Sequence, residues 1–512
     1  MSTPAGDTRE RLRVGVYAIL IALAAGNMSG RLLAVNAVNR QELETSVINQ
    51  RVAAAERKFK SEGLPDDLLQ AKLAAARQLI EQEERRQRPF LSGNDRSRWL
   101  AIRALVERGT FAIDDLIDRH VWNTIDMVKH RGRDGQMHLY SSKPPLLLVM
   151  LAGEYWLINQ ATGWTLEKNP YQVGRVMLFT VHVLPLVLMF AIVARLAERF
   201  GTTDWGRIFV VAAASFGTFL TTFAVVLNNH IIGAVSAAVS LYAFVRIWFD
   251  GDDRVRWFAV AGAAAAFAAA NELPALSLLA LLAAPLLWRN LRSWLLGFLP
   301  AAAVVAAAFF GTNYWAHDSL RPPYAHRSDS NPEDDDPEDN WYAYTYTVAG
   351  KERESYWLDP QGIDRGEPTK SAYAFHTLVG HHGVFSLTPM WVLSVFGLGV
   401  WLARGPRRQR ELAAGIALLS IVCLTFYIGL RPQDDRNYGG MTSGFRWVFW
   451  LAPLWLAAML PAADWLAASR RRMAIGLVLL AFSVLSASYP TWNPWTQPWI
   501  YNWLEANGWQ GF

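Results

Sequence analysis

The sequence predicts an all-α integral membrane protein with about 11–12 transmembrane helices. Two observations lead to this fold class. Of the 512 residues, 52% are hydrophobic, and they gather in roughly eleven long runs that approach the length needed to span a bilayer. Clusters of arginine separate consecutive runs, as expected for loops between membrane helices. Interfacial helices are expected in the first outer loop.

The first apolar run extends from Val14 to Met28 and continues weakly to Val38. It follows arginines at positions 9, 11 and 13 and so resembles a signal peptide. Because no clear small-residue cleavage site follows, we expect a retained first helix, with residues 1–38 forming a cytoplasmic N-terminus and this helix.

Basic loops set the expected topology, because lysine and arginine accumulate on the cytoplasmic side. Residues 39–143, 313–386 and 490–512 should then lie outside, while 144–312 and 387–489 hold the other membrane helices. The number of membrane crossings agrees with these assigned sides in two cases. Either the run at 145–160 enters the membrane without crossing it, or the charge rule fails at 195–207. The cytoplasmic clusters are Arg195–Arg207, Arg246–Arg256, Arg289–Arg292, Arg404–Arg410 and Arg470–Arg472.

The first outer segment contains two predicted helical units. Residues 40–88 are charged and helix-favouring, with a turn at 63–67, and read as a hairpin standing on the membrane. In residues 94–109, apolar side chains recur at helical spacing, which indicates an amphipathic helix lying along the interface. The second outer loop, 324–375, is polar and aromatic. Its acidic part, 329–339, lacks the spacing of a calcium loop and reads as a flexible acidic loop.

Several function classes find no support. Cys423 is the single cysteine, so there is no disulfide framework and no cysteine metal site. No P-loop or dinucleotide fingerprint occurs, which argues against direct use of ATP or NAD. The net charge of +5 comes mainly from basic loops and points to membrane topology, not to nucleic acid.

Lys143 begins a Lys-Pro-Pro-Leu motif at the edge of an apolar run. A cation placed where a membrane helix begins suits a phosphate at headgroup level. The alternative is an interfacial lysine beside a proline-started helix. Asn94 and Asp95 likewise allow two interpretations, an ordinary helix cap or an external carboxylate that acts as general base or metal ligand.

Weaker candidates lie elsewhere in the chain. Glu272 lies in a break between apolar runs, where it is either functional or simply exposed to water. His376, His381 and His382 cluster before an outer helix and could bind metal, phosphate or sugar. The aromatic residues at 341–346 either stack on a sugar or belong to an interfacial belt.

The pattern Asn94-Asp95-x-x-Arg98-Trp99, with Gly109 and then Lys143-Pro144-Pro145-Leu146, resembles the GT-C glycosyltransferases. More narrowly, it is similar to the protein O-mannosyltransferase and aminoarabinose transferase group. Asn94 and Asp95 fall on that group's Asp-Glu pair, and Lys143 falls on its phosphate-approaching lysine. Weaker similarities follow in order at Leu227-Asn228-Asn229-His230, Asn271-Glu272-Leu273-Pro274 and Gly439-Gly440-x-x-x-Gly444-x-Arg446-Trp447.

Three departures accompany the resemblance. Asn94 replaces the first acid, Asn228 to His230 replace the second acidic site, and the hairpin at 40–88 is an insertion. The resemblance implies a GT-C-type bundle in the cytoplasmic membrane with its active site on the outer side. It implies transfer of a sugar, with inversion, from a polyprenyl-phosphate donor to a hydroxyl of a glycan, lipid or protein.

In this interpretation Asp95, beside Asn94, is the base, and a neighbouring cation should keep its pKa low. No cofactor is certain, and a divalent metal is left open. A transporter or flippase would instead require paired helix breaks in symmetric halves, which the sequence lacks. A non-catalytic scaffold binding through the 40–88 hairpin is the other alternative. Substrate-binding or phosphate-binding candidates are Lys143, Arg446, Arg98, Asn229, His230, Glu272, His381 and His382.

Overall fold

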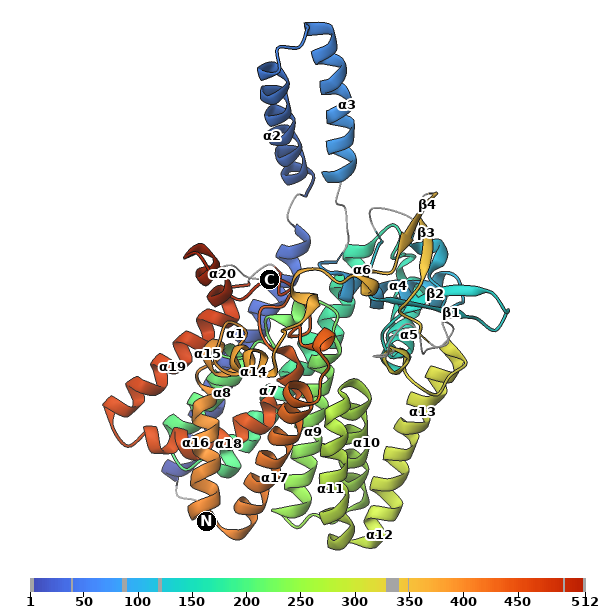
Figure 1. Cartoon of the computed structure of the whole chain (residues 1–512). Coiled ribbons are helices and arrows are strands. Elements are labelled where there is room, and N and C mark those ends of the chain that lie inside the picture. Colours follow the sequence, from blue (N-terminus) through green and yellow to red (C-terminus); the bar gives the residue numbers. More distant parts are fainter. Residues whose placement is uncertain are drawn as a thin grey trace.

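The computed structural model describes residues 4–37, 40–84, 90–117, 122–327, 340–348, 350–490 and 493–509. Within these ranges the chain is mostly helical, with two short antiparallel strand pairs. Figure 1 shows a helical bundle with the strand pairs and a helical hairpin at one end, opposite the start of the first helix. The acidic stretch at 329–339 lies outside the described residues.

Seven helical segments in the described ranges are long and apolar enough to cross a membrane, by length and composition. Three shorter apolar helices accompany them, so the described residues contain ten apolar helical segments, against the expected 11–12. The seven are Thr8–Ala34, Pro170–Phe200, Asn229–Trp248, Leu291–His317, Arg407–Gly429, Arg446–Leu466 and Arg470–Ser488, and the shorter ones are Val255–Asn271, Leu273–Arg289 and Trp391–Arg404.

The helices of the first half are α1 (Pro4–Ala37), α2 (Arg40–Ser61), α3 (Asp66–Glu84), α4 (Gly93–Glu107), α5 (Pro145–Thr162), α6 (Pro170–Leu178), α7 (Leu184–Phe200), α8 (Asp204–Phe216), α9 (Asn229–Trp248) and α10 (Val255–Asn271). Those of the second half are α11 (Leu276–Arg289), α12 (Leu291–Ser293), α13 (Leu299–His317), α14 (Lys370–Leu378), α15 (Val384–Leu387), α16 (Trp391–Arg404), α17 (Arg407–Leu424), α18 (Ala452–Leu466), α19 (Arg470–Ser488) and α20 (Trp499–Ala506). A π-helical turn joins α6 to α7, and another joins α12 to α13.

Helices α9 and α18 form the centre of the bundle. Helix α9 packs against α7, α10 and α18, and α18 also contacts α8 and α16. Small residues allow the closest approaches: a Cβ added at Gly397 of α16 would lie 2.0 Å from the Ala458 carbonyl oxygen of α18. Such contacts are typical of membrane helices, whose association depends on close packing. By contrast, α13 and α19 expose most of their apolar side chains, as contact with lipid requires.

The polar end of the bundle carries the hairpin of α2 and α3 and both strand pairs (Figure 1). Strands β1 (Met127–Arg131) and β2 (Met137–Ser141) pair antiparallel, as do β3 (Thr345–Val348) and β4 (Lys351–Glu354). The two outer segments meet here, because the Lys129 amide donates to the Trp341 carbonyl at 2.9 Å and its Nζ donates to the Thr345 carbonyl at 2.7 Å.

Helix α4 corrects the expectation of a helix lying exposed along the interface. Residues 95–104 are all buried, including three arginines. The guanidinium of Arg96 donates to the carbonyls of Asn123 and Phe90, and Arg103 pairs with Glu107 at 2.8 Å. Because these charges find partners inside the protein, the polar face of the helix does not need water.

Candidate functional site

An ion pair between Lys143 and Asp126 forms the first half of the candidate site. Lys143 Nζ lies 2.9 Å from Asp126 Oδ1, and the two side chains are 16% and 14% exposed. The β1–β2 register explains the contact: Met127 pairs with Ser141, so the residues just beyond each strand are also neighbours. Lys143 stands before Pro144, the N-cap residue of α5.

Each partner controls the charge of the other. Burial alone would raise the pKa of Asp126. The positive charge and hydrogen bond of Lys143 outweigh this effect, so the pKa is lowered and the carboxyl group stays ionised at neutral pH. Burial lowers the pKa of Lys143 to about 8, against the opposing effect of Asp126. Arg98 and Arg446 also lower it, so these two cations lie close enough to Lys143 to interact with it.

The backbone around Asp126 is held on every side. Its carbonyl accepts from the Ser97 hydroxyl at 2.5 Å and from the Ser142 amide at 3.2 Å. The carbonyl before it accepts from Trp357 Nε1 at 2.9 Å, and the one after it accepts from the Tyr344 hydroxyl at 3.2 Å. Since Tyr344 and Trp357 belong to the second outer loop, both outer segments position this carboxylate.

The second half of the site is a chain of hydrogen bonds across the ends of α4, α9 and α10 and the segment before α18. Arg98 Nη2 donates to Asn229 Oδ1 at 2.5 Å, and Asn229 Nδ2 donates to Glu272 Oε1 at 3.0 Å. Glu272 also contacts His230 Nδ1, and Arg446 Nη1 lies 2.7 Å from His230 Nε2. Because the Arg446 guanidinium can only donate, His230 Nε2 must accept its hydrogen bond. His230 Nδ1 then carries the N–H that donates a hydrogen bond to Glu272.

The guanidinium of Arg446 makes further contacts besides the one with His230. Its Nη2 donates to the Gly439 carbonyl at 2.5 Å, and its guanidinium lies 4.7 Å from the Trp495 ring centroid. Its Nε is buried and has no hydrogen-bond partner among the described residues. A Cβ at Gly439, whose φ is +90°, would lie 2.9 Å from that Nε, so glycine leaves the approach open. A buried guanidinium with an unused N–H suits an anionic ligand.

Asp95 occupies a different position from the one expected for a base. It is 1% exposed and accepts from Trp99 Nε1 and the Leu227 amide, both at 2.9 Å, and from the Leu91 amide at 3.4 Å. The expected low pKa is wrong: burial raises it to about 6, although the three donors and Arg98 oppose the shift.

Neither Asp95 nor its neighbour Asn94 is the N-cap of α4. That role belongs to Ser92, whose hydroxyl accepts from the Asp95 amide at 3.2 Å. Asn94 instead accepts from Arg98 Nη1 at 2.5 Å through its side-chain oxygen, which helps to fix the direction of the guanidinium.

Apart from Asp95, the predicted residues therefore fall into two groups. Asn94, Arg98, Asn229, His230, Glu272 and Arg446 belong to one hydrogen-bonded chain, and Lys143 interacts electrostatically with Arg98 and Arg446. His381 and His382 belong to another cluster, which contains Glu367 and His376 and could hold a metal ion.

Sequence reasoning missed Asp126. It is one of several aspartates in a stretch with weak periodicity, and nothing local connects it to its partner Lys143. A usable signal was present: Gly132 and Gly135 mark a turn between segments with strand-forming residues. Recognising that hairpin would have placed residue 126 beside residues 142 and 143.

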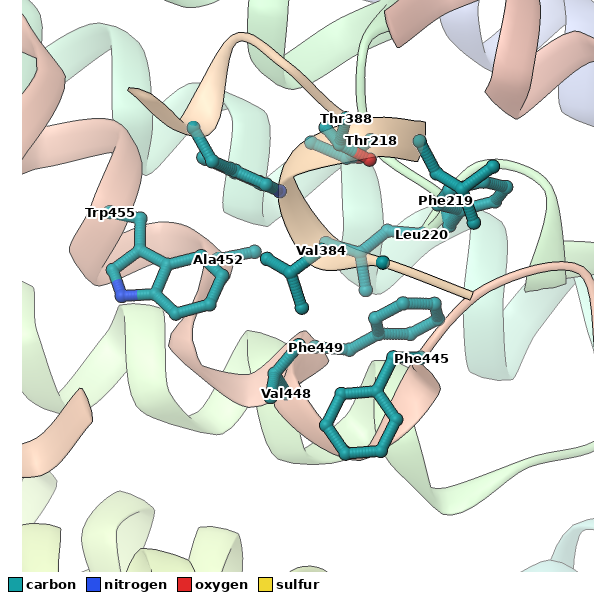
Figure 2. Close-up of a pocket in the computed structure, with 13 residues that line it drawn as sticks. Thr218, Phe219, Leu220, Val384, Thr388, Phe445, Val448, Phe449, Ala452 and Trp455 are labelled. Carbon is teal, nitrogen blue, oxygen red and sulfur yellow. The ribbon is translucent and has the colours of Figure 1, made fainter. Parts of the chain in front are cut away.

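The segment that carries Arg446 also lines an apolar pocket (Figure 2). Aromatic and aliphatic side chains from the α8–α9 connection, α15 and the start of α18 surround it, and its polar atoms are few. The lining residues are Thr218, Phe219, Leu220, Gly383, Val384, Leu387, Thr388, Trp391, Phe445, Val448, Phe449, Ala452 and Trp455.

Comparison with known proteins gives a distant likeness of shape. No family model and no curated protein matches the chain. Among solved structures, the archaeal oligosaccharyltransferase AglB from Archaeoglobus fulgidus, in complex with an inhibitory peptide and a dolichol-phosphate, aligns with 82% of this chain at 11% identity and a TM-score of 0.40. The apo form of the Archaeoglobus fulgidus oligosaccharyltransferase aligns with 81% of this chain at 12% identity and a TM-score of 0.40. Its complex with Zn and sulfate aligns with 80% of this chain at 13% identity and a TM-score of 0.37. The chain spans about half the length of these structures, 54%, 54% and 50% respectively. At such values the likeness defines neither family nor activity.

Proposed function

We propose that this protein is a membrane glycosyltransferase of the GT-C type that moves a sugar from a polyprenyl-phosphate donor to an acceptor hydroxyl at the outer face of the cytoplasmic membrane. One observation carries the proposal. Lys143, Arg98 and Arg446, which are far apart in sequence, converge at the polar end of an apolar bundle. Asp126, Asp95 and Glu272 interact with these cations, and a lipid phosphate at this depth would supply a further anion for the unused N–H of Arg446.

The transfer requires three functions that the site can supply. Lys143 and Arg446, supported by Arg98, hold the phosphate and stabilise its charge as the bond to the sugar carbon breaks. The leaving phosphate keeps the electron pair of that bond. The acceptor oxygen bonds to the same carbon, and its proton passes to a carboxylate base.

Asp126 is our choice for the base. It is ionised, partly exposed and 2.9 Å from the phosphate-binding lysine. Asp95, which the sequence suggested for this role, already accepts three N–H groups. We give it a positioning role, since it ties α4 to the backbone at Leu227 and so holds Arg98 against Asn229.

Transfer of labelled sugar from a lipid-linked pool by membranes tests the function. Lys143→Ala should reduce transfer by about 10²–10³-fold, the loss typical of one preorganised donor to a developing oxyanion. Lys168→Ala removes an exposed lysine just after α5 and is the matched control. Equal transfer by Lys143→Ala and wild type would exclude the phosphate-binding role of this residue.

A further inference from the structure

A cluster of metal-ligand side chains lies in the second outer segment. It is separate from the cationic site formed by Lys143, Arg98 and Arg446. Glu367 precedes α14, His376 lies in its last turn and His381 follows in the turn before α15. One ligand atom from each lies within 4.8 Å of the others. Glu367 and His381 are 7% and 0% exposed. We propose that Glu367, His376 and His381 bind a zinc-class divalent cation that fixes the fold of this outer region.

The donor set points to the class of metal. Two imidazole nitrogens and one carboxylate oxygen suit zinc and similar transition metals, whereas magnesium and calcium take oxygen ligands. Tetrahedral ligands about 2.1 Å from zinc lie about 3.4 Å from one another. Metal binding would require the side chains to rotate from their present spread, including the His376 and His381 rings, which are stacked with centroids 3.9 Å apart.

His376 supplies a second observation. Its Nδ1 is buried and has no hydrogen-bond partner among the described residues, a state that a bound cation would relieve. A Cβ added at Gly380 would lie 2.5 Å from this nitrogen, so the glycine keeps the space beside it open.

The surrounding groups form the kind of outer shell that orients metal ligands. The Tyr438 hydroxyl donates to Glu367 Oε1 at 2.6 Å. His381 Nδ1 lies 2.5 Å from His382 Nδ1, and the His382 ring stacks on Tyr438 with centroids 4.4 Å apart. His382 is thus a supporting residue in this arrangement, not a fourth ligand.

The cluster connects to the cationic site through one turn of backbone. Tyr438 adopts φ of +59°, unusual for a residue with a side chain, and the next residue, Gly439, accepts from Arg446. Holding Tyr438 through Glu367 would therefore keep the Gly439 carbonyl in place for Arg446. The metal has a structural role here and takes no part in the transfer itself.

Zinc binding by the purified full-length chain in detergent tests this proposal, and the readout is independent of sugar transfer. After chelation, titration with Zn²⁺ alone should restore one ion per chain by elemental analysis and raise the melting temperature. Glu367→Gln and His376→Ala should each bind at least about 100-fold more weakly, and Tyr438→Phe about 10-fold more weakly, as for an outer-shell loss.

Glu354→Gln and His138→Ala change the same residue types elsewhere in the outer segments and should bind as wild type does. Stoichiometric zinc in wild type that is lost only in the Glu367 and His376 variants supports the site. Absence of zinc binding by wild type, or equal binding by those variants, overturns it. If a variant does not fold, Co²⁺ bound to wild type decides: a visible spectrum of low-symmetry coordination supports the site, and the spectrum of hydrated Co²⁺ overturns it.

Discussion

Replacing Asp126 by asparagine gives the sharpest test of the proposed chemistry, because the two roles of this carboxylate separate with pH. As the counter-ion of Lys143, it keeps the pKa of that lysine at about 8 against burial. In the proposed reaction it also takes the acceptor proton as the base. Asparagine has nearly the same shape as aspartate but neither its charge nor its basicity. The substitution therefore removes both roles, and the pH dependence of transfer distinguishes the loss of one from the loss of the other.

The size of the counter-ion effect follows from the geometry. Opposite charges 2.9 Å apart attract by about 1.4 kcal/mol in water and about 6 kcal/mol at an effective dielectric constant of 20. One pKa unit corresponds to about 1.36 kcal/mol. Loss of the carboxylate should therefore lower the pKa of Lys143 by at least about one unit, to about 7 or below.

The assay is the pH profile of kcat/KM for sugar transfer, which reports groups of the free enzyme. In wild type, transfer should fall as pH rises through about 8, because the phosphate-binding lysine loses its proton. In Asp126→Asn this alkaline limb should move to lower pH. On the acid side of the variant's own alkaline limb, where Lys143 is charged in both proteins, the residual loss of about 10²–10⁴-fold measures the base.

Two results would refute this reasoning. An alkaline limb that stays near pH 8 in Asp126→Asn would mean that Asp126 does not control the charge of Lys143. Full transfer by the same variant on the acid side of its alkaline limb would mean that Asp126 is not the base. Asp115→Asn, at an exposed position of the same outer segment, should leave the profile unchanged.

Three further substitutions test the fold around the site, each read by thermal unfolding in detergent. Asp95→Asn should destabilise by about 1–3 kcal/mol, since its amide group faces N–H donors that need an acceptor; a melting temperature equal to wild type would contradict this. Gly397→Ala should lower the melting temperature because its Cβ would lie 2.0 Å from the Ala458 carbonyl oxygen, whereas Gly399→Ala on the same helix meets open space and should not. Ser92→Ala removes the N-cap of α4 and should cost about 1 kcal/mol, and an unchanged protein would show that the cap is dispensable.

The sequence predicted those parts of the molecule that depend on local pattern. Long apolar runs gave the helical class, and the motif around Lys143 gave the cation before α5. The number of membrane helices was less accessible, because α10, α11 and α16 are apolar but shorter than a full span, so apolar composition alone overestimates the number of full-length spans.

The ion pair of Lys143 with Asp126 depends on strand register and on contacts with the second outer loop, neither of which composition reveals. The same limit explains the error over Asp95. The sequence interpretation placed Asp95 beside a phosphate-binding cation and therefore expected a low pKa, but burial of the carboxyl group raises its pKa, although the Leu227 amide opposes the shift. Desolvation depends on the tertiary structure, which the sequence pattern did not reveal.

Helix α4 connects the two halves of the site, and this gives Asp95 its importance. Ser97 holds the backbone of Asp126 through its hydroxyl, and Arg98, the next residue, holds Asn229. These two side chains leave the helix in directions fixed by its rotation, and the Asp95 contact with the Leu227 amide fixes that rotation. A shift of α4 would therefore displace the base and the phosphate-binding chain together. Asp95→Asn should weaken transfer at every pH without moving the alkaline limb, whereas a base would change the shape of the profile.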